Sequence, residues 1–247
     1  MKSVPSTLCR VLLLAVVVLP SAFSQTEPLP TPSIPSAPER VVINFIVPID
    51  TNSVNMLLSI VNSQVRMGVK KITIVVASPG GDTTAAFAAY NILRNVPAEI
   101  TTFNAGNIDS AAMLIFCAGK YRYSFPDPAR FLIHGNSMLF GQNMSLDANM
   151  IDAQLQQIRN LNEMTIAVVN QTTGGKWTKQ IQDAVHGQTI LTPEIAKQWG
   201  LIQDIRSNFM EPGAVFVGVN SPMPPTPASP PVKLTSDPAL VSTSGTN

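Results

Sequence analysis

One serine, one histidine and a pair of glycines stand out because their types and positions suit acyl-transfer chemistry. Ser110 lies in the segment GNIDSAAM, residues 106–113. Residues 99–103 have the β-branched and aromatic content of a strand, and residues 111–118 are small and apolar, which is typical of a buried helix. A hydroxyl on the first turn of that helix would meet unpaired N–H groups and the positive end of the helix dipole, which favour an oxyanion. We therefore predict that Ser110 is a nucleophile; the alternative is that Asp109 or Ser110 only caps the helix.

A glycine-rich turn, ASPGGD at residues 77–82, is the second feature of this kind. Gly80 and Gly81 let the backbone approach a ligand closely and expose its N–H groups. The turn follows a predicted strand over residues 71–77, so we expect it at the same edge of the sheet as Ser110, where α/β folds bind ligands. Phosphate binding is a weaker interpretation because neither glycine-rich nucleotide fingerprint is present.

The chain has only two histidines, which limits the choice of general base. His134 follows the strand-like residues 130–133 and would enter the same region if that strand neighbours the one before Ser110. A single histidine after an apolar run is more often structural, but Ser110 and the glycine pair favour a catalytic role for His134. His186 follows a helical pattern over residues 177–185, and we expect it to be exposed or structural.

Strand and helix patterns alternate along the chain, and this alternation predicts the fold class. Strand-like runs at residues 41–47, 71–77 and 99–103 are each followed by a helical pattern, at residues 54–65, 83–94 and 111–118. Repeated units of this kind favour right-handed crossovers and an α/β fold with a mainly parallel sheet covered by helices. Strand-like residues 121–125 and 130–134 follow, and helical patterns at residues 146–169, 177–185 and 193–199 close the domain.

The composition changes along the chain in a way that predicts its segments. Residues 1–24 combine Lys2 and Arg10 with an apolar run and small residues, the pattern of a secretory signal peptide, so we expect export to a periplasmic or extracellular space. The apolar run is shorter than the roughly 20 residues of a spanning helix, so no stable membrane anchor is expected. Residues 25–38 form a Pro-rich linker, residues 39–209 a single domain, and residues 210–247 a disordered tail rich in Pro, Ser and Thr.

The charge and the cysteine content of the chain bear on two questions: whether it binds nucleic acid and whether it forms a disulfide. A formal net charge of +1 with 13% charged residues leaves no basic stripe, which argues against nucleic acid as a partner. Cys9 would leave with the signal peptide, so Cys117 would have no intramolecular disulfide partner. The apolar neighbours of Cys117 predict a small core residue.

Four segments carry a family resemblance: SPGG at residues 78–81, GNIDSAAM at 106–113, FLIH at 131–134 and LTPEIAKQWGLI at 191–202. In order and spacing they resemble the ClpP family of serine peptidases within the ClpP/crotonase fold, over residues 41–205. The resemblance implies that Ser110 is the nucleophile, that His134 is the base, and that the N–H groups of Gly81 and Ala111 form the oxyanion hole. It also implies that residues 140–175 form a projecting helical handle through which subunits assemble into homo-oligomeric rings.

The sequence departs from the family pattern at three places. Gln188 stands where the family has its catalytic aspartate, so Gln188 is the candidate third member of the triad; a Ser110–His134 dyad, or another partner such as Asp183, remains open. Asp109 replaces a small residue beside the nucleophile and adds a negative charge that would disfavour the oxyanion. The family's cytosolic members depend on an ATP-driven unfoldase, which an exported protein would not meet.

The resemblance and the residues together favour an exported, ATP-independent serine peptidase that hydrolyses peptide bonds of peptides or unfolded segments through an acyl-enzyme. This hypothesis requires no cofactor, and no metal site is predicted. One alternative is a catalytically weakened, ring-forming binding protein of the same fold. A second is a crotonase-like acyl-thioester enzyme, which would need cytosolic coenzyme A, so export argues against it.

Overall fold

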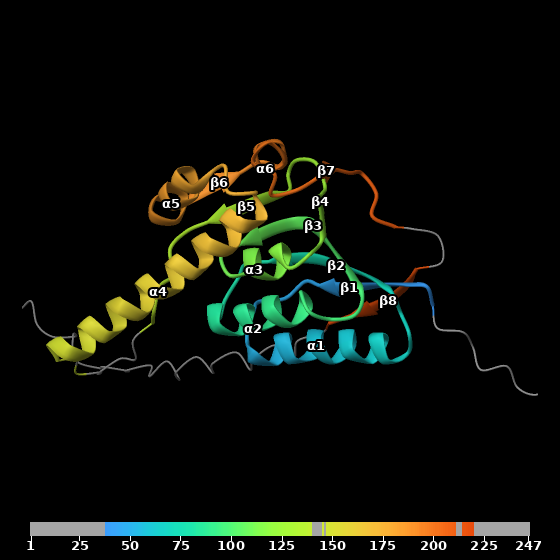
Figure 1. Cartoon of the computed structure of the whole chain (residues 1–247), viewed down its shortest axis with the longest axis horizontal. Coiled ribbons are helices and arrows are strands. Elements are labelled where there is room, and N and C mark those ends of the chain that lie inside the picture. The colour runs from blue at the N-terminus through green and yellow to red at the C-terminus, as the bar shows by residue number, and fades with distance from the viewer. Residues whose placement is uncertain (1–37, 140–144, 146, 211–213, 220–247) are drawn as a thin grey trace, which may run out of the picture. The chain divides into compact units, whose positions relative to one another are not determined.

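The computed structural model describes residues 38–139, 145, 147–210 and 214–219 (Figure 1). The predicted signal peptide, nearly all of the linker and most of the predicted tail lie outside these residues. In chain order the elements are β1 (Arg40–Phe45), α1 (Thr51–Arg66), β2 (Lys71–Ser78), α2 (Thr83–Leu93), β3 (Glu99–Asp109), α3 (Ala112–Cys117), β4 (Tyr121–Ser124), β5 (Arg130–Ile133), α4 (Ala148–Thr172), α5 (Thr178–Gly187), β6 (Thr189–Leu191), α6 (Pro193–Trp199), β7 (Asp204–Ile205) and β8 (Val215–Gly218).

These strands form one mainly parallel sheet in the order β6-β5-β3-β2-β1-β8, which confirms the predicted α/β class. Strand β3 changes its neighbour along its length: residues 101–104 pair with β4, and residues 107–109 pair with β5. A register irregularity between β2 and β3 falls at the same level of the sheet. The second half of β3 therefore carries its carboxyl end toward β5, the strand that precedes His134.

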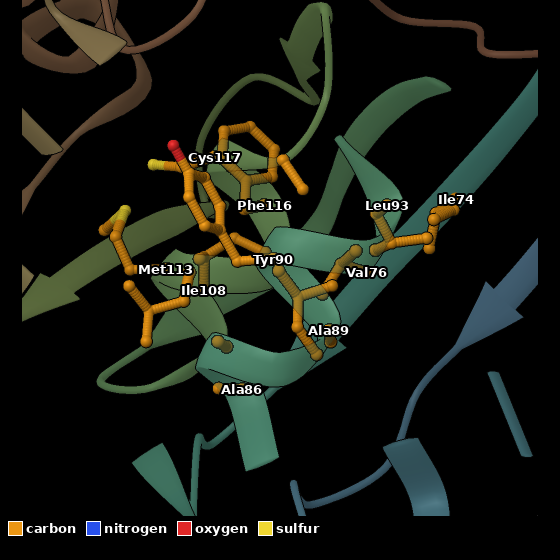
Figure 2. Close-up of a cluster of buried hydrophobic side chains, with 14 of the residues drawn as sticks. Ile74, Val76, Ala86, Ala89, Tyr90, Leu93, Ile108, Met113, Phe116 and Cys117 are labelled. Atoms are coloured by element: carbon orange, nitrogen blue, oxygen red, sulfur yellow. The ribbon is translucent and has the colours of Figure 1, made fainter. Parts of the chain in front are cut away.

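Helices α1, α2 and α3 lie on one face of the sheet, and a continuous apolar core fills the space between them and the strands. Helix α1 contacts β1, α2 packs against α1 and α3, and α3 lies against β3. Figure 2 shows part of this core, where side chains of α2 and α3 meet those of β2 and β3. Ile108, Met113 and Phe116 are fully buried there, and each such side chain stabilises the fold by about 1.5–3 kcal/mol. Because these side chains come from both β3 and α3, the core holds the end of β3 and the start of α3 in place.

Capping groups define the helix boundaries, and α1 begins at Thr51, three residues before the predicted helical pattern. Asp50 and Ser53 form a reciprocal capping box at the start of α1, and the Asp82 carboxylate accepts two backbone N–H groups at the start of α2. At α6, Thr192 caps the N-terminus, Pro193 occupies the first turn and Gly200 ends the helix in a left-handed conformation. The predicted bounds of α6 agree with the structure because each boundary has its own local cause.

Three strands, β6, β7 and β8, differ from the expectations; β7 has two residues and pairs in parallel with β4. The predicted tail began at residue 210, but Val215–Gly218 form β8, which pairs in parallel with β1. This segment is a short apolar run, Val215 to Val217, and it forms the edge strand beside β1. Ala214 and Phe209 pack against the cluster around Phe103. The sequence also did not predict β6, a three-residue strand that pairs antiparallel with β5.

Helix α4 spans 25 residues and is buried only in its C-terminal half, where Thr165, Ile166, Val168 and Val169 pack on the domain. Its N-terminal half extends away from the sheet (Figure 1). Part of the predicted handle, residues 140–144 and 146, lies outside the described residues. No helix within the described ranges is long and apolar enough to cross a membrane.

Candidate active site

Ser110 occupies a sharp turn between β3 and α3. Its φ of 56° is positive, which is uncommon for a residue with a side chain. The Ser110 backbone N–H donates to the Leu132 carbonyl at 2.9 Å, and the Ser110 carbonyl accepts from Met113 N–H at 3.0 Å. A serine held in this way between a strand and a helix is a feature of nucleophile elbows in hydrolases.

The observed turn corrects two expectations. Strand β3 continues to Asp109, and Ser110 precedes α3 rather than lying on its first turn. The residue at the N-cap position is Ala111, and no side chain caps the helix. The alternative that Asp109 or Ser110 serves only as a helix cap is therefore wrong.

His134 follows β5, which lies beside the second half of β3 as predicted. Asp109 pairs with Leu132 across the two strands, so the serine and the histidine emerge one and two residues beyond that pair. Both are half-buried and line one small pocket. Among the described residues no hydrogen bond joins their side chains, and in serine enzymes this bond often tightens only when substrate binds.

The glycine turn lies directly against the serine turn. A Cβ added to Gly80 would be 2.8 Å from Ser110 Cβ and 3.1 Å from Ala111 N, so only glycine fits there. Gly81 has a φ of 142°, and a Cβ on it would clash with the Ile49 carbonyl oxygen. The predicted convergence of the two loops is thus observed.

Two N–H groups around this turn have no acceptor among the described residues. Ile49 N–H donates to the Gly80 carbonyl, and Asp82 N–H donates to the Ile49 carbonyl, both at 2.8 Å. Within the described part of the chain, neither Gly81 N–H nor Ala111 N–H makes a backbone hydrogen bond. These are the two groups that the family resemblance assigned to an oxyanion hole.

Gln188 lies just beyond the antiparallel pairing of β5 and β6. That pairing ends at Ile133 and Thr189, so a further step would place Gln188 opposite His134. Gln188 instead ends α5 with a φ of 57°, is exposed, and is not among the described residues that line the pocket. Its role as third member stays a prediction. His186 is exposed, as expected.

The His134 ring has a different partner. Its Nδ1 lies 2.7 Å from the carbonyl oxygen of Gly135. Asp183, the other carboxylate considered from the sequence, pairs with Lys179 at 2.7 Å on the surface of α5.

The negative charge of Asp109 is matched by a cation. Asp109 Oδ2 accepts from Arg130 at 3.0 Å and from the Asn107 amide at 2.9 Å. The Asp109 side chain is 8% exposed and the Arg130 side chain 47%. This ion pair joins β3 to β5 and offsets the charge that we expected to disfavour an oxyanion.

Polar residues that the sequence did not single out lie in and beside the pocket: Thr83 and Asn136 line it, and Asn162 binds Asn136 from outside the lining. Asn136 N–H and Nδ2 donate to Asn162 Oδ1 at 2.7 and 2.9 Å, and Thr83 Oγ1 lies 2.6 Å from Asn136 Oδ1. The position of Asn136, two residues after His134, is the sequence feature that could have identified it as a site residue. Asn162 carried no signal, because a polar residue in an amphipathic helix normally faces solvent.

Within the described ranges, no group of three or more His, Cys, Asp or Glu side chains is placed so that it could hold a metal ion. The groups assembled at the end of β3 are a hydroxyl, an imidazole and backbone N–H donors. These groups suit nucleophilic attack on a carbonyl and stabilisation of the resulting oxyanion.

The fold and this arrangement define a class, α/β proteins with a serine-peptidase type of site. Comparison with known families shows which family within that class the chain resembles. The Clp protease family model matches residues 38–209, most of the chain. The chain therefore belongs to the Clp protease family, and the resemblance found in the sequence is confirmed.

Individual relatives give the degree of similarity. The chain is 34% identical over 141 residues to the ATP-dependent Clp protease proteolytic subunit 1 of Cutibacterium acnes, covering 55% of this chain and 62% of that protein. It is 33% identical over 138 residues to the subunit of the same name from Rhodococcus jostii, covering 55% of this chain and 60% of that protein. The matches thus span less than two thirds of the length of these relatives.

A solved structure agrees with the fold. A point mutant of ClpP1 from Listeria monocytogenes superposes with a TM-score of 0.60 at 20% identity, covering 69% of this chain and 92% of that chain.

Proposed function

We propose that this protein is an exported, ATP-independent serine peptidase that hydrolyses peptide bonds through a Ser110 acyl-enzyme. The observation that carries the proposal is the pocket shared by Ser110 and His134 beside the unpaired N–H groups of Gly81 and Ala111. Membership of the Clp protease family supports the same class of chemistry.

The proposed reaction follows from the roles of these groups. His134 takes the proton of the Ser110 hydroxyl as the oxygen attacks the scissile carbonyl, and Gly81 N–H and Ala111 N–H donate to the oxyanion. The protonated imidazole then gives its proton to the leaving amine, and water releases the acyl group by the reverse sequence. The backbone supplies the oxyanion donors, so the reaction needs no cofactor.

Export and independence of ATP are supported by residues 1–24, which have the pattern of a signal peptide. Assembly into a ring is supported by α4, whose outer half exposes Met150, Ile151 and Leu155, each more than 40% accessible. An apolar surface of this kind is normally covered by another subunit. Peptides or unfolded segments are the substrates that such an assembly would admit.

A fluorophosphonate probe tests the proposal because it labels only an activated serine. We expect labelling of wild type and none of Ser110→Ala, since one oxygen is removed without altering the fold. Ser137→Ala removes an exposed serine near His134 and is the matched control. His134→Ala should also abolish labelling, whereas His186→Ala should not. Wild-type protein that remains unlabelled would favour the ring-forming binding protein.

A further inference from the structure

The hydrogen bond at His134 Nδ1 fixes which nitrogen carries the proton. A carbonyl oxygen only accepts, so a 2.7 Å contact with Gly135 O requires a proton on Nδ1. In the neutral ring Nε2 then has the free lone pair, and the tautomer is the one a general base needs. We propose that the Gly135 carbonyl is the third member of the catalytic group, in place of a carboxylate or of Gln188. This inference rests on the proposed peptidase function.

The same peptide unit is held from its other side. The Gly135 carbonyl and the Asn136 N–H belong to one planar peptide group, in which they point in opposite directions. Asn162 Oδ1 accepts that N–H at 2.7 Å and the Asn136 side-chain amide at 2.9 Å. A hydrogen bond to the N–H polarises the carbonyl and strengthens the bond that the carbonyl accepts. Asn162 is thus a positioning residue that acts on His134 through one peptide group.

Packing restricts the alternatives for this peptide group. A Cβ at Gly135 would lie 3.2 Å from the Val185 carbonyl of α5 and 3.5 Å from Asn162 Nδ2 of α4. Thr83 of α2 approaches the Asn136 side chain at 2.6 Å. Three helices therefore surround residues 135–136. Gln188, in contrast, is exposed at the end of α5 and has no such support.

The chemical consequence is orientation without charge. In the serine-protease template, replacing the aspartate by its amide lowers the rate about 10⁴-fold, and the loss is attributed to the wrong tautomer. The Gly135 carbonyl supplies the correct tautomer but brings no negative charge to stabilise the imidazolium. A working enzyme with modest turnover is the expected result.

Three variants separate the two candidate third members. Gln188→Ala should keep the fluorophosphonate labelling rate within twofold of wild type. Asn162→Leu, which keeps the branched shape but loses the acceptor, should lower the rate at least tenfold. Asn162→Asp keeps an acceptor oxygen and should restore the rate to within about fivefold of wild type. Asn160→Leu, an exposed change on the same helix, is the matched control and should label normally.

The imidazole tautomer gives a second readout that does not depend on turnover. With only two histidines, ¹⁵N-histidine labelling and solid-state NMR resolve His134, and His186→Asn assigns it. We expect neutral Nδ1–H in wild type and in Gln188→Ala, and a tautomer mixture in Asn162→Leu. A wild-type Nε2–H tautomer, or a tenfold loss of labelling in Gln188→Ala alone, would overturn the inference. If wild type is not labelled, the proposed function fails and the catalytic role of the Gly135 carbonyl fails with it, even where the Nδ1–H tautomer shows that the contact exists. If wild type is labelled but Asn162→Leu does not fold, the tautomer in wild type and in Gln188→Ala decides the inference.

Discussion

Removing the Arg130 guanidinium should destabilise the fold more than removing the whole ion pair. In Arg130→Ala the buried Asp109 carboxylate keeps only the Asn107 amide, because Asp109 Oδ1 already has no partner among the described residues. Breaking a fully buried pair from one side costs about 3–5 kcal/mol. The Arg130 side chain is 47% exposed, so water screens its charge and we expect a cost of about 2 kcal/mol.

The double variant Asp109→Ala, Arg130→Ala also removes the buried carboxylate that Arg130→Ala leaves unpaired. It should cost about 1 kcal/mol or less, because an apolar replacement of both partners is often close to neutral. Lys179→Ala is the control, since it breaks an exposed pair within α5 and should cost less than about 0.5 kcal/mol.

Urea unfolding measures these differences directly. With a slope of about 2 kcal/mol per molar urea, Arg130→Ala should lower the midpoint by about 1 M and the double variant by about half of that or less. All variants are compared at one protein concentration, because subunit association shifts apparent stability. If the double variant is as unstable as Arg130→Ala or more so, the stranded carboxylate is not the source of the cost and the reasoning is refuted.

Three further predictions concern other parts of the molecule. Gly81→Ala keeps its N–H, but the added Cβ would clash with the Ile49 carbonyl and displace that N–H, so fluorophosphonate labelling should fall by up to about 10²–10³-fold, the cost of losing one oxyanion donor. Gly174→Ala, also at positive φ but with open space around it, should label normally, and equal rates for the two variants would remove Gly81 from the site. Burial raises the pKa of the Cys117 thiol from 9.0 to about 11, so its contribution to stability is complete below pH 9 and should fall by up to about 3 kcal/mol as the pH rises to 11. Cys117→Ala should show a smaller loss over that range, and parallel curves for the two proteins would contradict this. Leu155→Asp on the outer half of α4 should weaken assembly more than tenfold in sedimentation, while Gln156→Asp should not; a wild type that is monomeric at micromolar concentration would contradict a ring.

Much of the fold follows from local sequence. Strand β2 is a nearly continuous apolar run, and α6 has a cap, a proline and a glycine at its boundaries, so both could be predicted from a few residues each. The neighbouring loops at Gly80 and Ser110 could be predicted because carboxyl ends of parallel strands lie at one edge. The ClpP-like motifs then pointed to the same residues.

Features that depend on register or on distant pairing could not be predicted in the same way. Strand β6 has only three residues, and β8 is ordered by an edge of β1 that lies far from it in the sequence. The Asp109–Arg130 pair requires the β3–β5 register, which no local pattern encodes. Asn162 is separated by 26 residues from the backbone that it binds, and its sequence context is that of an ordinary surface asparagine.

The change of partner along β3 explains why the nucleophile and the base meet. Because β4 pairs only with residues 101–104, the edge of β3 beyond them is free to accept β5. The Ser110 N–H continues that pairing with its bond to Leu132 O, so the backbone itself sets how far the hydroxyl stands from His134. Arg130 and Asp109 join the same two strands through their side chains. Arg130→Ala, which removes the Asp109–Arg130 ion pair, should therefore slow fluorophosphonate labelling under conditions where the protein is still fully folded, whereas Lys179→Ala should not.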